Sequence, residues 1–170
     1  MYADQHQYNN SGVIMNFDIE PYCPTSHRDG VRLVERQARE HPWSNARLIM
    51  LLNLRATRTF VACDQGFVAG FAISHIHTLS NTLELITVCV LSEFRRRGIG
   101  TRLINAVLDC AGDNELDVIC EIKERNLDVQ MTMKAVGLLC TKIVSFSPEE
   151  DSLYVFQLEP NASVFTPYDY

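Results

Sequence analysis

Three arginines and two glycines lie together where an apolar segment gives way to a helical pattern, in the order Arg95-Arg96-Arg97-Gly98-Ile99-Gly100. Glycine leaves the backbone bare, and the first N–H groups of a helix have no intrahelical acceptor, so such a terminus favours an anion. A cluster this small suits one anionic ligand, and a diphosphate would fit. Plain turn geometry also places glycines before helices, and this alternative stays open.

The flanking periodicity assigns this junction to a strand that leads into a helix. Residues 82–91 are apolar at most positions, which predicts a central strand buried on both faces. We expect its side chains to alternate, with Leu83, Leu85, Thr87, Cys89 and Leu91 on one face and Ile86, Val88 and Val90 on the other. From residue 98 to about 111 the apolar residues recur at helical spacing.

The other segments complete a mixed sheet with helices on both faces. Alternating or continuous apolar runs predict strands at about 13–20, 58–64, 66–78, 118–123, 138–146 and 152–158. Helical spacing predicts helices at about 26–40 and at 127–136. A further helix is predicted to begin after Ser44, its possible N-cap, and to end at about residue 54. We therefore expect an α/β (α+β) fold in one domain, residues 15–158, between tails at 1–14 and 159–170.

Composition excludes several classes of protein. The formal net charge of −6 argues against general nucleic-acid binding, which needs a basic face. No segment approaches the roughly 18 uncharged apolar residues of a membrane span, and no secretory leader is apparent, so we expect a cytoplasmic protein. The six cysteines occur singly and the histidines lack ligand spacing. We therefore expect buried thiols and no metal.

The stretch at 95–100 resembles the coenzyme A signature of GNAT acetyltransferases, Q/R-x-x-G-x-G/A, and the element order is similar to that family from about residue 15 to 158. The resemblance implies acetyl-CoA as cosubstrate and a mostly antiparallel sheet of six to seven strands, in which two strands splay apart around the pantetheine arm. Within the family, the chain more closely resembles ribosomal-protein alanine N-acetyltransferases and related N-terminal acetyltransferases. Three features carry this resemblance: His41-Pro42-Trp43-Ser44, Glu121 and Glu124-Arg125-Asn126. Trp43 has two possible roles, as packing or as part of an acceptor wall.

The resemblance also implies which residues bind the cosubstrate. The pyrophosphate would contact the backbone N–H groups of Arg97, Gly98, Gly100 and Thr101, with added positive charge from Arg95 and Arg96. The pantetheine arm would pair with the strand backbone at Val88 and Val90 and bond to Asn126. A helix N-cap is the alternative role of Asn126.

Acetyl transfer to an amine requires a neutral nucleophile and a proton for the leaving thiolate. Glu121 is our candidate for proton removal, through water, because it lies in the otherwise apolar stretch Cys120-Glu121-Ile122, where desolvation would raise its proton affinity. An outward-facing edge glutamate is the alternative. Family members usually carry a tyrosine acid where this chain has Met133, so Tyr154, water or the thiolate's own basicity must serve.

For the acceptor, we expect the N-terminal α-amino group of a protein or peptide. The ordinary pKa of such a group, about 7.7–8.0, leaves an appreciable neutral fraction at pH 7. A small-molecule amine acceptor and a non-catalytic acyl-CoA-binding module are the alternatives. We expect a monomer or homodimer with neither nucleic acid nor membrane as a partner.

Overall fold

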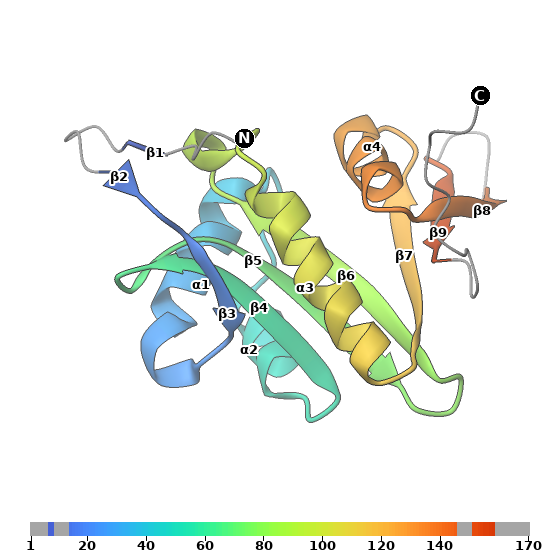
Figure 1. The fold of residues 1–170 in the computed structure, drawn as a ribbon, viewed down its shortest axis with the longest axis horizontal. Helices are drawn as coiled ribbons and strands as arrows, with labels where there is room; N and C mark the ends of the chain where they lie inside the picture. The colour runs from blue at the N-terminus through green and yellow to red at the C-terminus, as the bar shows by residue number, and fades with distance from the viewer. Residues whose placement is uncertain (1–6, 9–13, 146–150, 159–170) are drawn as a thin grey trace, which may run out of the picture.

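A seven-stranded sheet, in the order β3-β4-β5-β6-β7-β9-β8, forms the centre of the computed structural model, which describes residues 7–8, 14–145 and 151–158 (Figure 1). Its strands are β3 (Asp18–Pro21), β4 (Thr57–Asp64), β5 (Phe67–His77), β6 (Thr82–Val90), β7 (Asp117–Lys123), β8 (Leu139–Val144) and β9 (Leu153–Gln157). All neighbouring pairs are antiparallel except β6 and β7, which are parallel. The predicted mixed sheet is confirmed, with β6 at its centre.

Helices cover both faces of this sheet, as predicted (Figure 1). On one side α1 (Pro24–Ala38) and α2 (Asn45–Asn53) pack against β4, β5 and β6, and we call this side the α1 face. On the other side α3 (Ile99–Asp113) packs across β4, β5 and β6, and α4 (Leu127–Ala135) lies beside it near β7. We call this side the α3 face.

Local chemistry sets the helix boundaries. Pro24 occupies the first turn of α1, where its missing N–H is not needed. The Ser44 hydroxyl accepts a hydrogen bond from the Arg47 backbone N–H at 3.2 Å and caps α2, as the sequence predicted. Gly98 precedes α3 in the left-handed region at φ 77°, a conformation that glycine adopts without steric cost.

The segment predicted as one strand at 13–20 is broken in the structure. β1 (Gln7–Tyr8) pairs with β2 (Ile14–Met15) in a separate two-stranded sheet, and β3 begins only at Asp18. Between them Phe17 is 2% exposed and its ring packs edge-on against Phe94 at 5.1 Å. This inward turn interrupts the strand. Residue 13 and the predicted strand end at 146 lie outside the described residues.

A β-bulge interrupts the pairing of β5 with β6. Ile73 pairs with Thr87, but the next residue of β5, Ser74, pairs with Leu85, so Ile86 has no partner on β5. Paired residues point to the same face, whereas successive residues of β5 alternate between faces. The alternation of β6 side chains between the two faces of the sheet therefore shifts by one residue at the bulge.

This bulge corrects one prediction. Thr87 and Cys89 point to the α1 face, where the Thr87 hydroxyl accepts a hydrogen bond from Arg39. Leu83 and Leu85 point to the α3 face instead. The prediction that these four β6 side chains share a face is wrong, because no feature of the sequence marks the extra residue.

Among the described residues, no helix is both long and apolar enough to cross a membrane.

Candidate active site

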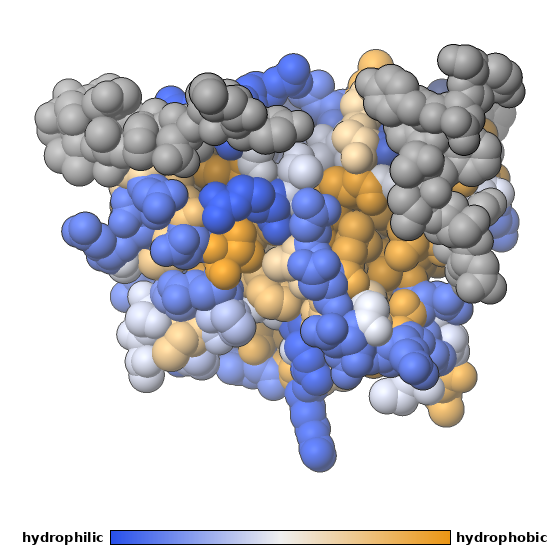
Figure 2. Space-filling view, viewed as in Figure 1, coloured by the Kyte–Doolittle hydropathy of each residue, from blue (hydrophilic) through white to orange (hydrophobic). Residues whose placement is uncertain are grey.

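β6 and β7 separate after a short run of shared pairing. Their register includes only Thr82, Leu83 and Glu84 of β6 with the β7 residues 117–119. Beyond this point β6 continues to Val90 beside β5, and β7 continues to Lys123 beside β9. The strands thus form a V whose closed end lies at Glu84. In the space-filling view, hydrophobic surface runs alongside the polar outer side of α3 near this region (Figure 2).

The turn before α3 lies at the open end of this V. The first intrahelical bond runs from the Arg102 N–H to the Gly98 carbonyl at 3.0 Å, so the N–H groups of residues 99–101 lie outside the helical ladder. A Cβ built on Gly98 would meet no atom within 4 Å, and one on Gly100 would meet only Val90 at 3.9 Å. Internal packing therefore does not require these glycines. The bare backbone and open space fit a diphosphate.

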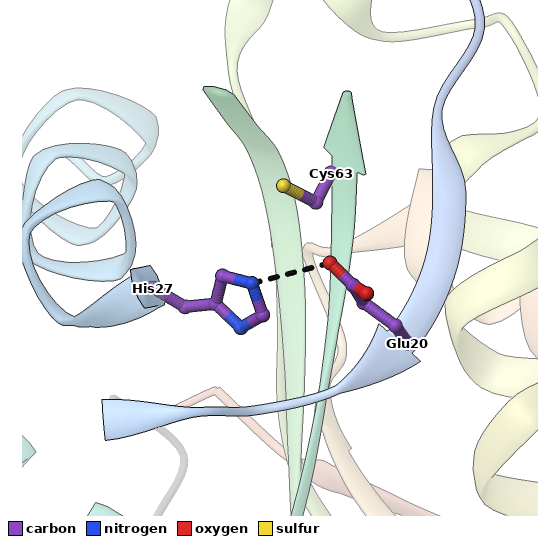
Figure 3. Close-up of side chains that lie close together, drawn as sticks. All are labelled: Glu20, His27 and Cys63. Carbon is purple, nitrogen blue, oxygen red and sulfur yellow. Dashed lines mark ion pairs between the residues drawn. The ribbon is translucent and has the colours of Figure 1, made fainter. Parts of the chain in front are cut away.

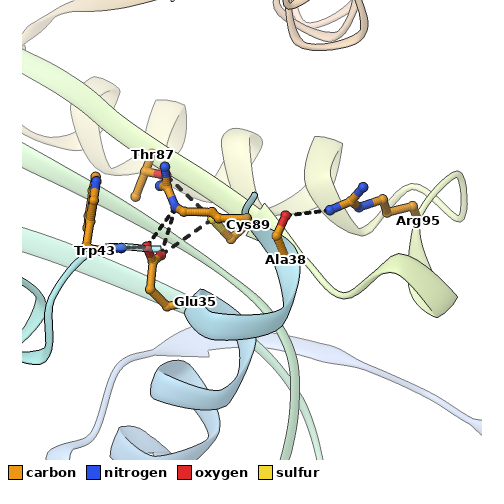
Figure 4. Close-up of polar contacts among 7 residues, drawn as sticks. Glu35, Ala38, Trp43, Thr87, Cys89 and Arg95 are labelled. Carbon is orange, nitrogen blue, oxygen red and sulfur yellow. Dashed lines mark hydrogen bonds and ion pairs between the residues drawn. The ribbon is translucent and has the colours of Figure 1, made fainter. Parts of the chain in front are cut away.

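The three arginines of the turn point in different directions. Arg95 donates from Nε to the Val90 carbonyl at 3.0 Å and from a terminal nitrogen to the Ala38 carbonyl at 2.8 Å (Figure 4). Arg96 is exposed, with φ 61°, and lies 3.6 Å from Asp128 of α4. The Arg97 guanidinium lies 5.5 Å from the Phe94 ring. Arg95 thus ties β6 to the end of α1.

A buried polar network joins the end of α1 to β6 on the α1 face (Figure 4). Glu35 is 1% exposed, and its two oxygens lie 2.8 and 2.9 Å from Arg39 Nε. Glu35 also accepts from the Trp43 backbone N–H at 2.9 Å and from the Cys89 thiol at 3.8 Å. Burial raises the pKa of Cys89, so it remains a thiol donor. The Glu35–Arg39 spacing of four residues was visible in the sequence as a helical ion pair, but sequence reasoning missed it.

Trp43 stands between two guanidinium groups on the same face. Arg39 lies 4.3 Å and Arg47 4.4 Å from its ring centroid. The indole is half-buried and packs against the core. Trp43 therefore has the packing role, which was one of its two predicted roles. Arg39 and Arg47 hold its ring in place beside β6.

Strand register places the two predicted catalytic residues on opposite faces. Val118 pairs with Leu83 and so points to the α3 face, as do alternate residues along β7 to Ile122. Glu121 therefore points to the α1 face, where its side chain is exposed. Tyr154 pairs with Ile122 and points to the α3 face. Neither prediction for Glu121 describes its position. Its side chain is exposed rather than buried among apolar neighbours, and β7 is an inner strand rather than an edge strand.

Met133 lies on α4, and Asn126 directly precedes this helix, beside the open end of the V. Met133 is 1% exposed and belongs to the hydrophobic core. Asn126 occupies the N-cap position, but its side chain makes no capping bond and is exposed. Gln130, which sequence reasoning missed, donates from Nε2 to the carbonyls of Lys123 and Glu124 at 3.2 and 2.8 Å. It fixes α4 to the end of β7.

The structure brings together three side chains that the sequence left apart: Glu20, His27 and Cys63 (Figure 3). Their ligand atoms lie within 4.8 Å of one another. The Cys23 backbone N–H donates to His27 Nδ1 at 3.0 Å, so the ring proton must be on Nε2, which faces Glu20 at 3.1 Å. A metal on Nε2 would displace that proton. The neutral ring would then carry its proton on Nδ1, which could no longer accept the hydrogen bond from Cys23 at the N-cap of α1. The arrangement therefore fits a hydrogen-bonded anchor between β3, β4 and α1.

The cysteines differ in exposure more than predicted. Cys63, Cys89 and Cys120 are buried and Cys110 is intermediate, whereas Cys23 and Cys140 are exposed. The prediction of buried thiols is wrong for the two exposed residues. Cys23 precedes α1, and Cys140 lies on the edge strand β8, whose side chains are mostly exposed among the described residues.

Comparison with known proteins agrees with this geometry. Residues 28–137 match the sequence model of the acetyltransferase (GNAT) family. Similar solved structures include ribosomal-protein-S18-alanine N-acetyltransferase from Escherichia coli, with a TM-score of 0.72 and 17% identity over 84% of this chain and 93% of that chain. Arabidopsis thaliana NAA60 in complex with acetyl-CoA has a TM-score of 0.69 and 15% identity, over 84% and 98%. Nourseothricin acetyltransferase has a TM-score of 0.63 and 14% identity, over 84% of this chain and 97% of that chain. A search of curated protein sequences found no match.

Gly98→Ala and Gly66→Ala form a matched pair that tests the turn. Both glycines have positive φ, 77° and 84°, with no atom within 4 Å of an added Cβ. Each alanine should therefore cost about 1–2 kcal/mol of unfolding free energy. Only Gly98→Ala should also weaken acetyl-CoA binding, by ~10-fold or more, because its Cβ enters the open space. Urea denaturation and calorimetry measure the two effects, and equal affinities in both variants would contradict the site.

Cys23 should be the most readily alkylated thiol at neutral pH. Hydrogen bonds from Thr25 and Ser26 lower its pKa to about 7, and the thiolate is the reactive form. We expect its alkylation rate with iodoacetamide to be half-maximal near pH 7, as followed by mass spectrometry of the Cys23 peptide. Thr25→Val should move this midpoint upward. A midpoint near 9 in the unaltered protein would contradict this prediction.

Proposed function

Because the chain belongs to the GNAT acetyltransferase family, we propose that it transfers the acetyl group of acetyl-CoA to the N-terminal α-amino group of a protein or peptide. The chain is an enzyme of the N-acetyltransferase class, and its family uses acetyl-CoA. The observation that carries the proposal is the V between β6 and β7, with an open glycine turn at its wide end. This arrangement supports a thioester between the strands and a pyrophosphate at α3.

Several described groups support the proposed binding of acetyl-CoA. The N–H groups at the start of α3, next to the turn at Gly98, offer donors to the pyrophosphate. The backbone of β6 at Val88 and Val90 borders the V, although the Val90 carbonyl is already bonded to Arg95. The exposed amide of Asn126 is available to the pantetheine arm, since it makes no capping bond. Arg96 would have to leave Asp128 to reach a phosphate.

In the proposed reaction, the acceptor amine approaches from the α1 face and attacks the thioester directly. Glu121 points to this face from β7 and is exposed, so a water molecule can join it to the amine. The wall formed by Arg39 and Trp43 lies beside Thr87 of β6 on the same face. These residues would orient the acceptor.

The leaving thiolate needs a proton, and we propose that Tyr154 or water supplies it. Met133 is buried in the core and carries no acidic proton. Tyr154 points to the α3 face, the side on which α4 and Met133 also lie. Its phenol is half-buried rather than enclosed. Proton removal and proton donation would then occur on opposite sides of the sheet.

We also propose a reducing compartment, such as the cytoplasm, for this enzyme. All six cysteines are free thiols. Disulfides form and persist in oxidising compartments, and free exposed thiols such as Cys23 are typical of reducing ones.

Peptides with free and blocked N-termini test the acceptor. We expect acetyl-CoA to acetylate a peptide that has a free α-amino group, and to leave unmodified the same peptide with a blocked N-terminus and an internal lysine. The reason is the lower pKa of the α-amino group, about 7.7–8.0 against about 10.4 for lysine. Mass spectrometry locates the acetyl group. Acetylation only of small amines would favour the alternative that nourseothricin acetyltransferase suggests, and binding without thiol release would favour a non-catalytic module.

Glu121→Gln tests proton removal. We expect kcat to fall by ~100-fold, the usual order for loss of a general base, with acetyl-CoA affinity unchanged. Glu115→Gln is the control, because it neutralises an exposed carboxylate in the turn between α3 and β7. Thiol release and calorimetry give the two quantities. An unaltered rate in Glu121→Gln would remove this residue from its role.

A further inference from the structure

A polar cavity of about 200 Å³ lies between α1 and the start of α2. Its lining residues are Asp29, Arg32, Leu33, Arg36 and Asn45. Arg32 and Arg36 are four residues apart, so both side chains project from the same side of α1. The cavity shares no residue with the turn before α3 or with the V between β6 and β7.

This cavity presents hydrogen-bond donors that have few partners within the chain. Arg32 donates from Nε to Asn45 Oδ1 at 3.3 Å, and Asn45 Nδ2 has no acceptor among the described residues. Arg36 is exposed and forms no salt bridge with a described acid, whereas Asp29 lies 3.9 Å from the Arg32 guanidinium. Two guanidinium groups and one carboxylate leave the cavity with a positive charge, so it attracts an anion.

The helices around the cavity form a basic region in an acidic protein. Residues 24–53 contain five arginines and three acidic residues, a net charge of +2, whereas the whole chain has a net charge of −6. Among the described residues of this region, only Arg39 pairs with a buried acid, Glu35. A field of this sign attracts an acidic partner and repels a basic one.

The cavity lies next to the wall formed by Arg39 and Trp43, which borders the proposed route of the acceptor. Arg36 directly follows Glu35, whose carboxylate accepts a hydrogen bond from the Trp43 backbone N–H, and Asn45 lies two residues beyond Trp43. An extended chain advances roughly 3.3–3.6 Å per residue. A peptide that reaches the thioester with its first residue and passes Trp43 therefore brings one of its next few side chains to the cavity.

Extending the acetyl transfer proposed above, on which this inference rests, we propose that Arg32, Arg36 and Asn45 bind an acidic side chain of the acceptor, downstream of the acetylated residue. The carboxylate accepts hydrogen bonds from the two guanidinium groups and from Asn45 Nδ2. Pockets for drug-sized ligands begin at roughly 300 Å³, so this cavity fits one side chain. Leu33 offers an apolar contact to the methylene groups of a glutamate. These residues set specificity and take no part in the chemical step.

A glutamate scan of an otherwise neutral peptide tests this specificity. The glutamate is placed in turn at each of about six positions after the N-terminal residue, with glutamine and lysine at the same position as references. We expect one position at which glutamate lowers KM by ~5-fold relative to glutamine, the order of a partly exposed ion pair. The kcat should be unchanged, because the contact binds substrate and transition state equally. Raising the ionic strength from ~0.05 to ~0.5 M should remove most of the advantage.

Variants of the cavity should change this preference in opposite directions. Arg36→Gln should abolish it, and Arg36→Glu should transfer it to the lysine peptide. Asp29→Asn should increase it by ~2-fold, because a competing carboxylate is lost. Arg28→Gln is the matched control, since it neutralises an exposed arginine of the same helix that does not line the cavity. Damage to the fold cannot reverse the sign of a preference, and melting temperatures confirm that each variant is folded.

The outcomes separate this inference from the proposed function. Equal KM values for the glutamate, glutamine and lysine peptides in the unaltered enzyme would overturn this inference alone, because the peptides would still be acetylated. The same loss of preference in Arg28→Gln as in Arg36→Gln would also overturn it, since general charge rather than the cavity would then be responsible. An unaltered enzyme that acetylates none of the peptides would overturn the proposed function as well.

Discussion

The two central strands of the sheet part after a short run of shared pairing, and the backbone edges that they expose need hydrogen-bond partners. Beyond Glu84, among the strands that the structure describes, β6 pairs only with β5 and β7 pairs only with β9. A backbone group left without a partner in a desolvated position costs about 1–3 kcal/mol. Water or an amide-bearing ligand must therefore complete the sheet there. The pantetheine arm, with its own amides, meets this demand in the function proposed.

Holding such a gap open requires that the adjoining helices stay in place. Glu35 and Arg39 connect the end of α1 to Trp43 and to Thr87, while Arg95 connects the same end to the last carbonyl of β6. A buried ion pair adds little net stability, since desolvation offsets its attraction. Its value here is positional: it fixes the helix end against one strand of the V, so that the strand cannot close onto its neighbour without breaking several polar bonds.

Local features of the sequence predicted much of this arrangement. The turn at Gly98 was recognisable because its elements are contiguous, and the order of strands and helices followed from periodicity. Features that depend on register were not recognisable. The bulge at Ile86 reversed the predicted face of Leu83 and Leu85, and it placed Glu84 and Glu121 on the α1 face. His77 meets Glu84 only through that register, and Glu20, His27 and Cys63 meet only after β3, β4 and α1 have packed.

The same register separates the two halves of the proposed chemistry. Glu121 and Glu84 point to the α1 face, whereas Tyr154 and Met133 belong to the side of α3 and α4. An acceptor can therefore lose a proton to the exposed carboxylate of Glu121 without competing for the group that protonates the thiolate. Because β-strand side chains alternate, the neighbouring strands β7 and β9 supply both environments within a few residues. A chain that lacks the usual tyrosine on α4 can then use a donor from another strand, provided that the donor points to the α3 face, and Tyr154 meets this condition.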